Sequence, residues 1–174
     1  MGHFDSDRCV HELLATDDAT RDAIITAFGS AVCDKAGRPD RVALRNIIFN
    51  DEERRRMLEN ILHPAVHAQW TALADDARRR GTWLLVDIPL LYETHVESEF
   101  DRVIVVASAK KTQIERLTQE RGLAPALAEK IIAAQLDLEA KTQKAEHVIW
   151  NDSTRRNLDR QARLFADWLR VRFS

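Results

Sequence analysis

Short apolar runs alternate with helical patterns along most of the chain. Residues 83–88, bounded by Arg80-Gly81 and Pro89, form the clearest run and predict a strand that is buried on both faces. Runs at 102–107 and 147–150 predict two more buried strands, and Phe4-Asp5-Ser6-Asp7 has the pattern of a strand that ends in a helix. This alternation predicts an α/β fold with a parallel sheet.

Apolar residues at three- and four-residue spacing predict the helices between these strands. Asp7 is a candidate N-cap for a helix that begins near Arg8. His63-Pro64 should divide a longer pattern into two helices, because proline disfavours a helical residue before it. Other predicted features are a helix at 17–28 ended by Gly29, a helix capped by Asp40 and ended by Asn50-Asp51, helices at 110–120 and 124–146, and a last helix capped by residues 151–153.

Length, composition and charge exclude several classes of protein. The 174 residues suffice for one domain, and 45% hydrophobic with 31% charged residues is an ordinary soluble balance. A net charge of −2 implies no polyanion-binding surface overall, so we expect no nucleic-acid partner. No apolar stretch approaches the roughly 20 residues of a membrane helix, and no signal peptide is visible, so we expect a cytoplasmic protein without a membrane partner.

Cysteine and histidine provide no convincing metal or disulfide pattern. Cys9 and Cys33 form no close-spaced pair, which argues against a zinc site or a disulfide framework and fits a reducing compartment. His63 and His67 are four residues apart and could share a helix face, but a third ligand is not evident. For these histidines a capping or core role is the favoured interpretation.

Acidic residues follow two of the predicted strands. Asp5 and Asp7 come after the first and Asp87 ends the run at 83–88. Ligands of open α/β sheets bind at the carboxyl ends of strands, and carboxylates suit Mg²⁺ or the acceptance of a hydroxyl proton. Basic residues between 110 and 144 could neutralise phosphate charge, although each could also belong to a solvated helix face. These patterns by themselves predict a phosphate-handling α/β domain.

Several motifs together resemble the dephospho-CoA kinase family. The resemblance runs from Phe4 to the last helix, and its blocks are moderately specific singly and quite specific jointly. They are the D-x-D element at 4–7, G-R-P-D-R-V-A-L-R at 37–45 with Ile48-Phe49 and Asp51, L-E-N-I-L-H-P at 58–64, D-I-P-L-L-Y-E at 87–93, Gln113 with Arg116, Ala133-Ala134-Gln135, and Val148-Ile149 with Asn151.

This resemblance implies a fold, a reaction and its substrates. The fold is a three-layer, P-loop kinase-like parallel sheet in a single domain, with a core at 1–16, 82–121 and 147–174, a helical acceptor-binding region at 17–81 and a helical lid at 122–146. The reaction is transfer of the γ-phosphate of ATP to the 3′-hydroxyl of dephospho-CoA, the last step of coenzyme A synthesis, with Mg²⁺ as cofactor. The oligomeric state stays open.

The same resemblance implies roles for individual residues. Asp7 would be the general base, and Asp87 would hold Mg²⁺ through water. On the acceptor side the implied residues are Asp5, His63, Pro64, Leu90, Leu91 and Glu93. On the nucleotide and lid side they are Arg116, Arg121, Gln135, Lys141 and Asn151.

One element of the family pattern has no counterpart in these 174 residues. The glycines stand at positions 2, 29, 37, 81 and 122, and none opens the phosphate-binding motif G-x-x-x-x-G-K-[ST]. The family's first strand, expected between 83–88 and 102–107, is also missing, so the sheet should gap, close up or borrow a strand. Leu138 replaces an arginine found in some members, and Glu120-Arg121 is shifted against the usual pair. Phosphate transfer by the chain as given is expected to be impaired.

Three interpretations follow from this departure. The first, favoured by the retained Asp7, His63-Pro64 and Asp87, is a kinase whose reading frame starts further upstream. The second is a catalytically dead relative that binds CoA or dephospho-CoA. The third is another P-loop nucleotide kinase, against which the H-P and P-L-L-x-E blocks argue.

Overall fold

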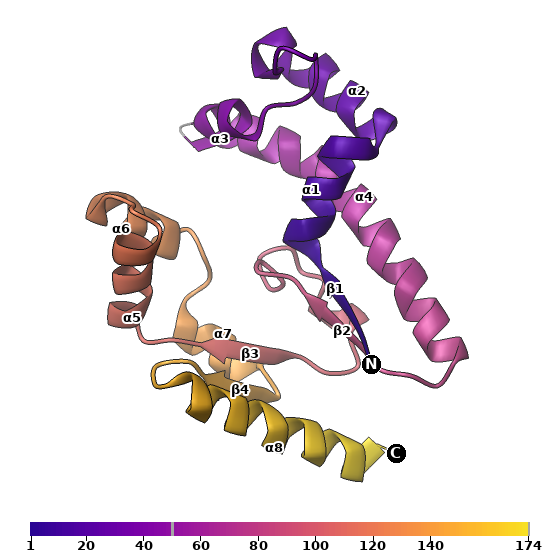
Figure 1. The fold of residues 1–174 in the computed structure, drawn as a ribbon, viewed down its shortest axis with the longest axis vertical. Coiled ribbons are helices and arrows are strands. Elements are labelled where there is room, and N and C mark those ends of the chain that lie inside the picture. Colours follow the sequence, from indigo (N-terminus) through magenta and orange to yellow (C-terminus); the bar gives the residue numbers. More distant parts are fainter. Residues whose placement is uncertain (50, 174) are drawn as a thin grey trace. The chain divides into compact units, whose positions relative to one another are not determined.

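The computed structural model describes residues 1–49 and 51–173 and has an α/β fold with parallel strands (Figure 1). The predicted helix end at Asn50 lies outside the described residues. The chain divides into two compact units, Met1–Pro89 and Leu90–Ser174. Each contains one two-stranded parallel sheet.

In the first unit, β1 (Gly2–Asp5) pairs in parallel with β2 (Leu84–Asp87). The register sets Gly2 opposite Leu84 and Asp5 opposite Asp87. The position of β2 confirms the predicted strand, but the prediction that it is buried on both faces is wrong, because Leu85 remains 40% exposed. Burial alternates along β2, as expected when only one face of a strand is covered.

Aspartates begin the first two helices of this unit. Asp5 caps α1 (Ser6–Thr16) by accepting a hydrogen bond of 2.9 Å from the Arg8 N–H. The prediction of Asp7 as N-cap was wrong, because the helix starts earlier and places Asp7 in its first turn. The helix predicted at 17–28 is confirmed as α2 (Asp18–Phe28), which Asp17 caps and Gly29 ends at φ 77°.

The longest helix runs through a proline. After the short turn η1 (Ser30–Val32) and α3 (Arg41–Phe49), α4 (Glu52–Arg79) continues for 28 residues with Pro64 inside it. The predicted division at His63-Pro64 was therefore wrong. Pro64 removes one helical hydrogen bond, but the helix buries Leu58 before the proline and Trp70 after it. Packing on both sides of Pro64 thus outweighs the local preference.

The helices α1 to α4 enclose the hydrophobic core of the first unit. Ile24 and Val32 have no exposed surface, and further apolar side chains pack around them. The buried members of this cluster are Leu14, Ile24, Phe28, Val32, Leu44 and Leu58. Their burial stabilises this helical region, because the hydrophobic effect grows with the apolar area removed from water.

In the second unit, β3 (Ile104–Ala107) pairs in parallel with β4 (His147–Trp150). Both strands lie where the sequence predicts them, but the expected full burial of the strand at 102–107 is wrong, because Val106 is 59% exposed. The turn η2 (Glu97–Glu99) precedes β3. After β3, α5 (Lys110–Glu115) widens into a π-helical turn, η3 (Arg116–Glu120), so the predicted helix at 110–120 is not a uniform α-helix.

The predicted single helix at 124–146 is two helices. They are α6 (Pro125–Ala133) and α7 (Leu138–Lys144), and Asp137 caps α7 by accepting a hydrogen bond from the Glu139 N–H. A polar side chain that caps a new helix competes with continuation of the old one, which accounts for the break.

The last helix, α8 (Arg155–Phe173), lies along β4 (Figure 1). The ring of Phe165 stacks on His147 at a centroid distance of 4.5 Å. The predicted cap at residues 151–153 was wrong. Thr154 accepts from the Asn157 N–H, while the Asp152 carboxylate accepts from the Ala109 N–H.

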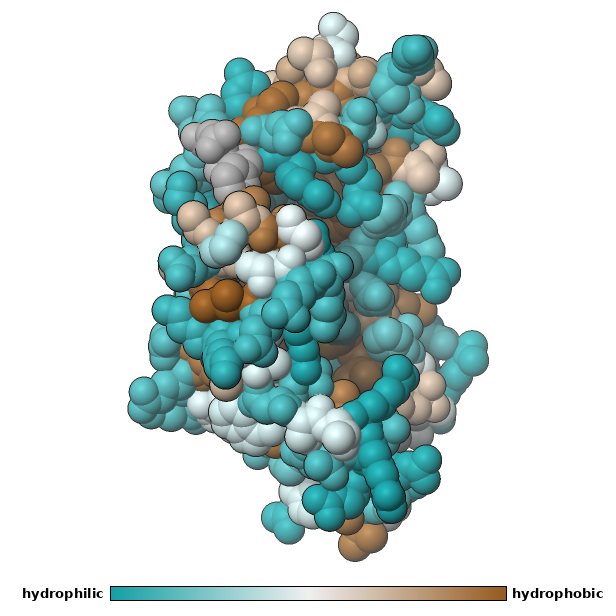
Figure 2. Space-filling model, turned by 60° about the vertical axis from the view of Figure 1, so that its left-hand side comes forward, coloured by the Kyte–Doolittle hydropathy of each residue, from teal (hydrophilic) through white to brown (hydrophobic). Residues whose placement is uncertain are grey.

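Hydrophilic side chains cover most of the face shown in Figure 2, with brown apolar patches between them. Among the described helices, none is both long and apolar enough to cross a membrane.

Candidate active site

The carboxyl ends of β1 and β2 bring two acidic side chains side by side. Asp5 and Asp87 are direct partners in the strand register. The Ser6 hydroxyl donates a hydrogen bond of 2.8 Å to the backbone carbonyl of Asp87. Backbone pairing and this side-chain contact therefore fix the relative position of the two strand ends.

Asp87 has a raised pKa. Partial desolvation is the main cause, and the nearby carboxylates of Asp5 and Asp7 add to it, while His3 acts in the opposite direction. The side chain is still exposed by surface area, so water screens these interactions. A cation bound at these strand ends would relieve the repulsion among the three carboxylates.

Asp5 and Asp7 differ in how accessible their carboxylates are to a ligand. One oxygen of Asp5 is occupied by the Arg8 N–H, whereas Asp7 is exposed in the first turn of α1. An exposed carboxylate beside other acids can accept a proton from a substrate hydroxyl. The geometry thus gives Asp5 a capping function and leaves Asp7 accessible.

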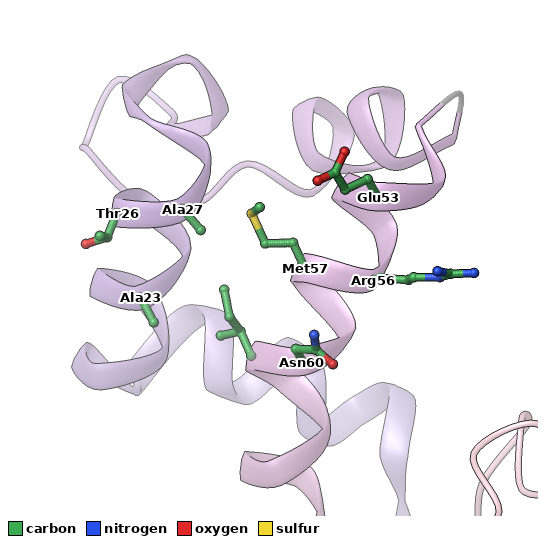
Figure 3. A pocket seen from close by; sticks show the side chains of 8 residues that line it. Ala23, Thr26, Ala27, Glu53, Arg56, Met57 and Asn60 are labelled. Carbon is green, nitrogen blue, oxygen red and sulfur yellow. The ribbon is translucent and has the colours of Figure 1, made fainter.

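His63 and Pro64 lie in the middle of α4, and both are exposed. A groove of about 620 Å³ opens between α2 and α4 in the same helical region (Figure 3). Met57 lies between the two helices, while the Arg56 side chain points away from α2. The residues that line the groove are Ala23, Thr26, Ala27, Glu53, Arg56, Met57, Asn60 and Ile61.

In the second unit, three predicted site residues form one cluster. The Lys141 ammonium lies 2.8 Å from Glu93 Oε1 and donates to Gln135 Oε1 at 3.2 Å. Glu93 Oε1 also accepts a hydrogen bond of 2.7 Å from the Leu136 N–H. Burial raises the pKa of Glu93, but the hydrogen bonds from Lys141, Leu136 and its own N–H outweigh burial and hold that pKa below its usual value.

Two other predicted residues meet at the ends of β3 and β4. Arg116 donates to the Asn151 backbone carbonyl at 2.7 Å and to the Ser108 hydroxyl at 3.2 Å. The Asn151 side-chain oxygen is 3.4 Å from the same guanidinium. Arg116 opens the π-helical turn η3, and such turns are frequent at functional sites.

The remaining predicted residues of this unit are not part of either group. Arg121 is exposed after η3, and its N–H donates to the Arg116 carbonyl. Leu90 and Leu91 are half-buried, and their carbonyls accept hydrogen bonds from the Thr94 hydroxyl.

Sequence reasoning missed three participants. Ser108 and Asp152 join the two strand ends, and the Leu136 N–H binds Glu93. Ser108 directly follows β3, so the rule that ligands gather at the carboxyl ends of strands would have found it. The Leu136 contact is made by the backbone, and side-chain identity gives no signal for it.

Within residues 1–49 and 51–173, no three histidine, cysteine, aspartate or glutamate side chains are grouped to hold a metal ion. Mg²⁺ in phosphate sites usually takes one or two carboxylates, with phosphate oxygens and water completing its shell. The Asp5–Asp87 pair fits that smaller requirement.

Known proteins resemble the chain over most of its length. A family model described as dephospho-CoA kinase matches residues 2–157. The chain belongs to the dephospho-CoA kinase family. A dephospho-CoA kinase of Symbiobacterium thermophilum is 40% identical over 167 residues, which cover 95% of this chain and 69% of the relative. One from Bacillus cereus is 36% identical over 152 residues, which cover 87% and 76%.

Solved structures share the fold of this kinase family member. The crystal structure of TT1252 from Thermus thermophilus matches with a TM-score of 0.76 and 25% identity, over 97% of this chain and 84% of that one. A dephospho-CoA kinase from Campylobacter jejuni matches with a TM-score of 0.68 and 23% identity, over 96% and 84%. The α/β architecture expected for a dephospho-CoA kinase is thereby confirmed.

Proposed function

We propose that the acidic ends of β1 and β2 are the acceptor side of an ATP-dependent transfer of phosphate to the 3′-hydroxyl of dephospho-CoA. The observation that carries this proposal is the register that sets Asp5 opposite Asp87 and leaves Asp7 exposed one residue into α1. Asp7 accepts the proton of the attacking hydroxyl. Deprotonation raises the nucleophilicity of that oxygen, as in other phosphoryl-transfer sites.

Asp87 is the residue we assign to Mg²⁺, held through water. When bound, the ion neutralises negative charge on the phosphates of ATP. The raised pKa of Asp87, caused by partial desolvation and then by Asp5, supports this assignment, because a cation would favour its ionised form. Asp5 holds the start of α1 and so keeps Asp7 in place.

Within the second unit, we assign basic groups to the nucleotide. Lys141 carries the charge that meets nucleotide phosphates, and Arg116 with Asn151 shapes the nucleotide side at the ends of β3 and β4. Arg121 and Gln135 are assigned to the same side. These assignments rest on the family motifs and on the contacts within the unit.

We assign the groove between α2 and α4 to the part of dephospho-CoA that does not react. That part carries methylene and methyl groups together with amides, and the groove combines Met57 and Ile61 with polar Asn60 and Glu53. A Met57→Arg variant should lower the affinity for dephospho-CoA while leaving ATP affinity unchanged. An unchanged dephospho-CoA isotherm for this variant would remove the groove from the proposal.

A second candidate function is binding of CoA-like ligands without chemistry. It would not need the motif G-x-x-x-x-G-K-[ST], which cradles the phosphates of ATP and does not occur in these 174 residues. This function requires the acceptor groove but not the proton acceptance by Asp7.

Calorimetry and ADP release together separate these functions. The full chain is titrated with dephospho-CoA and with Mg²⁺-ATP, and ADP release is measured with both present. The kinase proposal expects release that depends on dephospho-CoA, that Asp7→Asn abolishes, and that the exposed control Asp22→Asn retains. Dephospho-CoA binding without ATP binding supports the binding module instead. Failure to bind dephospho-CoA overturns both.

A further inference from the structure

Glu93 joins two segments that lie far apart in the sequence. Its Oε1 accepts from the Leu136 N–H at 2.7 Å and lies 2.8 Å from the Lys141 ammonium. Only 20% of the Glu93 side chain and 12% of the Lys141 side chain are exposed. An ion pair this shielded from water is screened less than one on the surface.

Tyr92, which precedes Glu93, contacts α7, the helix that carries Lys141. The Lys144 ammonium lies 5.4 Å from the centroid of the Tyr92 ring, within the range of a cation–π interaction. Lys141 and Lys144 are three residues apart on α7, so they lie on one face of that helix. Tyr92 and Glu93 therefore hold α7 by two adjacent contacts.

Hydrogen bonds also hold residues 135–137, the turn before α7. Gln135 accepts from Lys141, Leu136 donates to Glu93, and Asp137 caps the helix. The flexible four-carbon stem of a lysine has many rotamers, and each fixed partner reduces them. The ammonium of Lys141 is thereby set in one place relative to residues 135–137.

The second carboxylate oxygen of Glu93, Oε2, is buried. Oε2 has almost no exposed surface and, among the described residues, no hydrogen-bond partner. Oε1 is already engaged by Leu136 and Lys141 and Oε2 is buried, so neither oxygen of Glu93 is presented to a substrate hydroxyl in this arrangement. This observation argues against direct contact between Glu93 and the acceptor.

We propose that Glu93 is a positioning residue that fixes Lys141 and the turn before α7, and that it does not itself contact dephospho-CoA. The proposal rests on the proposed function in one respect, the assignment of Lys141 to the nucleotide phosphates. It replaces the acceptor-side role expected for Glu93 from the motif D-I-P-L-L-Y-E. Loss of Glu93 then weakens nucleotide binding through Lys141.

The first test measures the position of Lys141 without any substrate. The full chain and its Glu93→Gln and Glu93→Ala variants are acetylated with an N-hydroxysuccinimide ester, and the rate at each lysine is read by peptide mass spectrometry. Lys141 should react about tenfold faster in Glu93→Ala, since a charge-assisted hydrogen bond is lost. Lys130, an exposed lysine of α6, should keep its rate and serves as the internal reference.

The second measurement is hydrogen exchange at the Leu136 amide. Exchange should accelerate in Glu93→Ala, and Glu93→Gln should retain part of the protection because an amide oxygen still accepts. Glu129→Gln, which removes an exposed charge from α6, should change neither observable. Circular dichroism verifies that Glu93→Gln and Glu93→Ala are folded. Unchanged Lys141 reactivity and Leu136 exchange in both folded Glu93 variants would overturn the proposal.

Ligand affinities separate this proposal from the proposed function. A positioning role predicts weaker Mg²⁺-ATP binding and unchanged dephospho-CoA binding in Glu93→Ala. Weaker dephospho-CoA binding with unchanged ATP binding would instead make Glu93 an acceptor contact. If the unmodified chain binds neither ligand, the proposed function fails, while Lys141 reactivity still decides whether Glu93 positions that lysine.

Discussion

Asp5 stands directly opposite Asp87 in the register of β1 and β2, yet the two carboxylates have different surroundings. Asp5 accepts a backbone hydrogen bond at the start of α1, whereas desolvation and neighbouring acids raise the pKa of Asp87. The Asp5 carboxylate thus holds the start of a helix, whereas the surroundings of Asp87 disfavour its charged form. Substitutions at the two positions should therefore have opposite effects.

Removal of the Asp5 side chain should destabilise the first unit. An Asp5→Ala variant loses the cap of α1, a change that costs about 1 kcal/mol in other proteins. Asp5→Asn should restore most of that loss, because asparagine also accepts from the Arg8 N–H. Urea unfolding at pH 7 measures both variants. Equal stability of Asp5→Ala and the unmodified chain would show that the cap contributes nothing.

Asp87 should make stability depend on pH in the direction opposite to a salt-bridged acid. The pKa of Asp87 is higher in the folded chain than in the unfolded chain. Protonated Asp87 therefore stabilises the fold fully at pH values below the unfolded-state pKa, and this stabilisation is lost as pH rises through the folded-state pKa. Asp87→Asn should therefore be more stable relative to the unmodified chain at pH 7 than at pH 3. The comparison is made by urea unfolding, with exposed Asp22→Asn as control. A relative stability of Asp87→Asn that does not change with pH would contradict the assigned shift.

Pro64 should cost stability where it stands. It lies inside α4 and is exposed, so Pro64→Ala restores a helical hydrogen bond and removes a clash with the preceding turn. We expect a gain of up to about 3 kcal/mol in the free energy of unfolding, the difference between the two residues in a helix interior. Ala68→Gly, on the same helix, should lower stability by about 1 kcal/mol and verifies that the method reports on α4.

A functional role for Pro64 would appear in a different measurement. If the proline shapes the acceptor site, Pro64→Ala should weaken dephospho-CoA binding even as it stabilises the chain. A variant that gains stability and keeps its affinity would leave Pro64 without a role in binding.

The sequence predicts the fold best where one local pattern determines the structure. Gly29 ends α2 and Asp40 precedes α3 as expected, because helix ends depend on side chains close in sequence. The passage of α4 through Pro64 could not be predicted, because it depends on packing at Leu58 and Trp70. Burial of Leu85 and Val106 was overestimated, since a run of apolar residues does not reveal which face of a strand is covered.

For the candidate site, the sequence predicts which residues belong to it but not how they contact one another. Motifs alone grouped Glu93, Gln135 and Lys141 among the functional residues, and the structure brings these three together. Their mutual contacts could not be derived from the sequence, because Glu93 and Leu136 are 43 positions apart and one partner is a backbone N–H. The motif therefore predicts which residues are functional, and the contacts are the basis of the proposal that Glu93 acts through Lys141.

Arg116 should be needed for the stability of the second unit as well as for any nucleotide binding. Its guanidinium joins the Ser108 hydroxyl to the Asn151 carbonyl, and lysine cannot reproduce two such bonds from one planar group. Arg116→Lys should lower the free energy of unfolding by about 2 kcal/mol, a usual value for hydrogen bonds of a charged group. Arg121→Lys is the matched control, because Arg121 is exposed and should leave stability within about 0.5 kcal/mol. If Arg116→Lys proves as stable as Arg121→Lys, the contacts between the two strand ends do not hold β3 and β4 together, and Arg116 is available to a ligand.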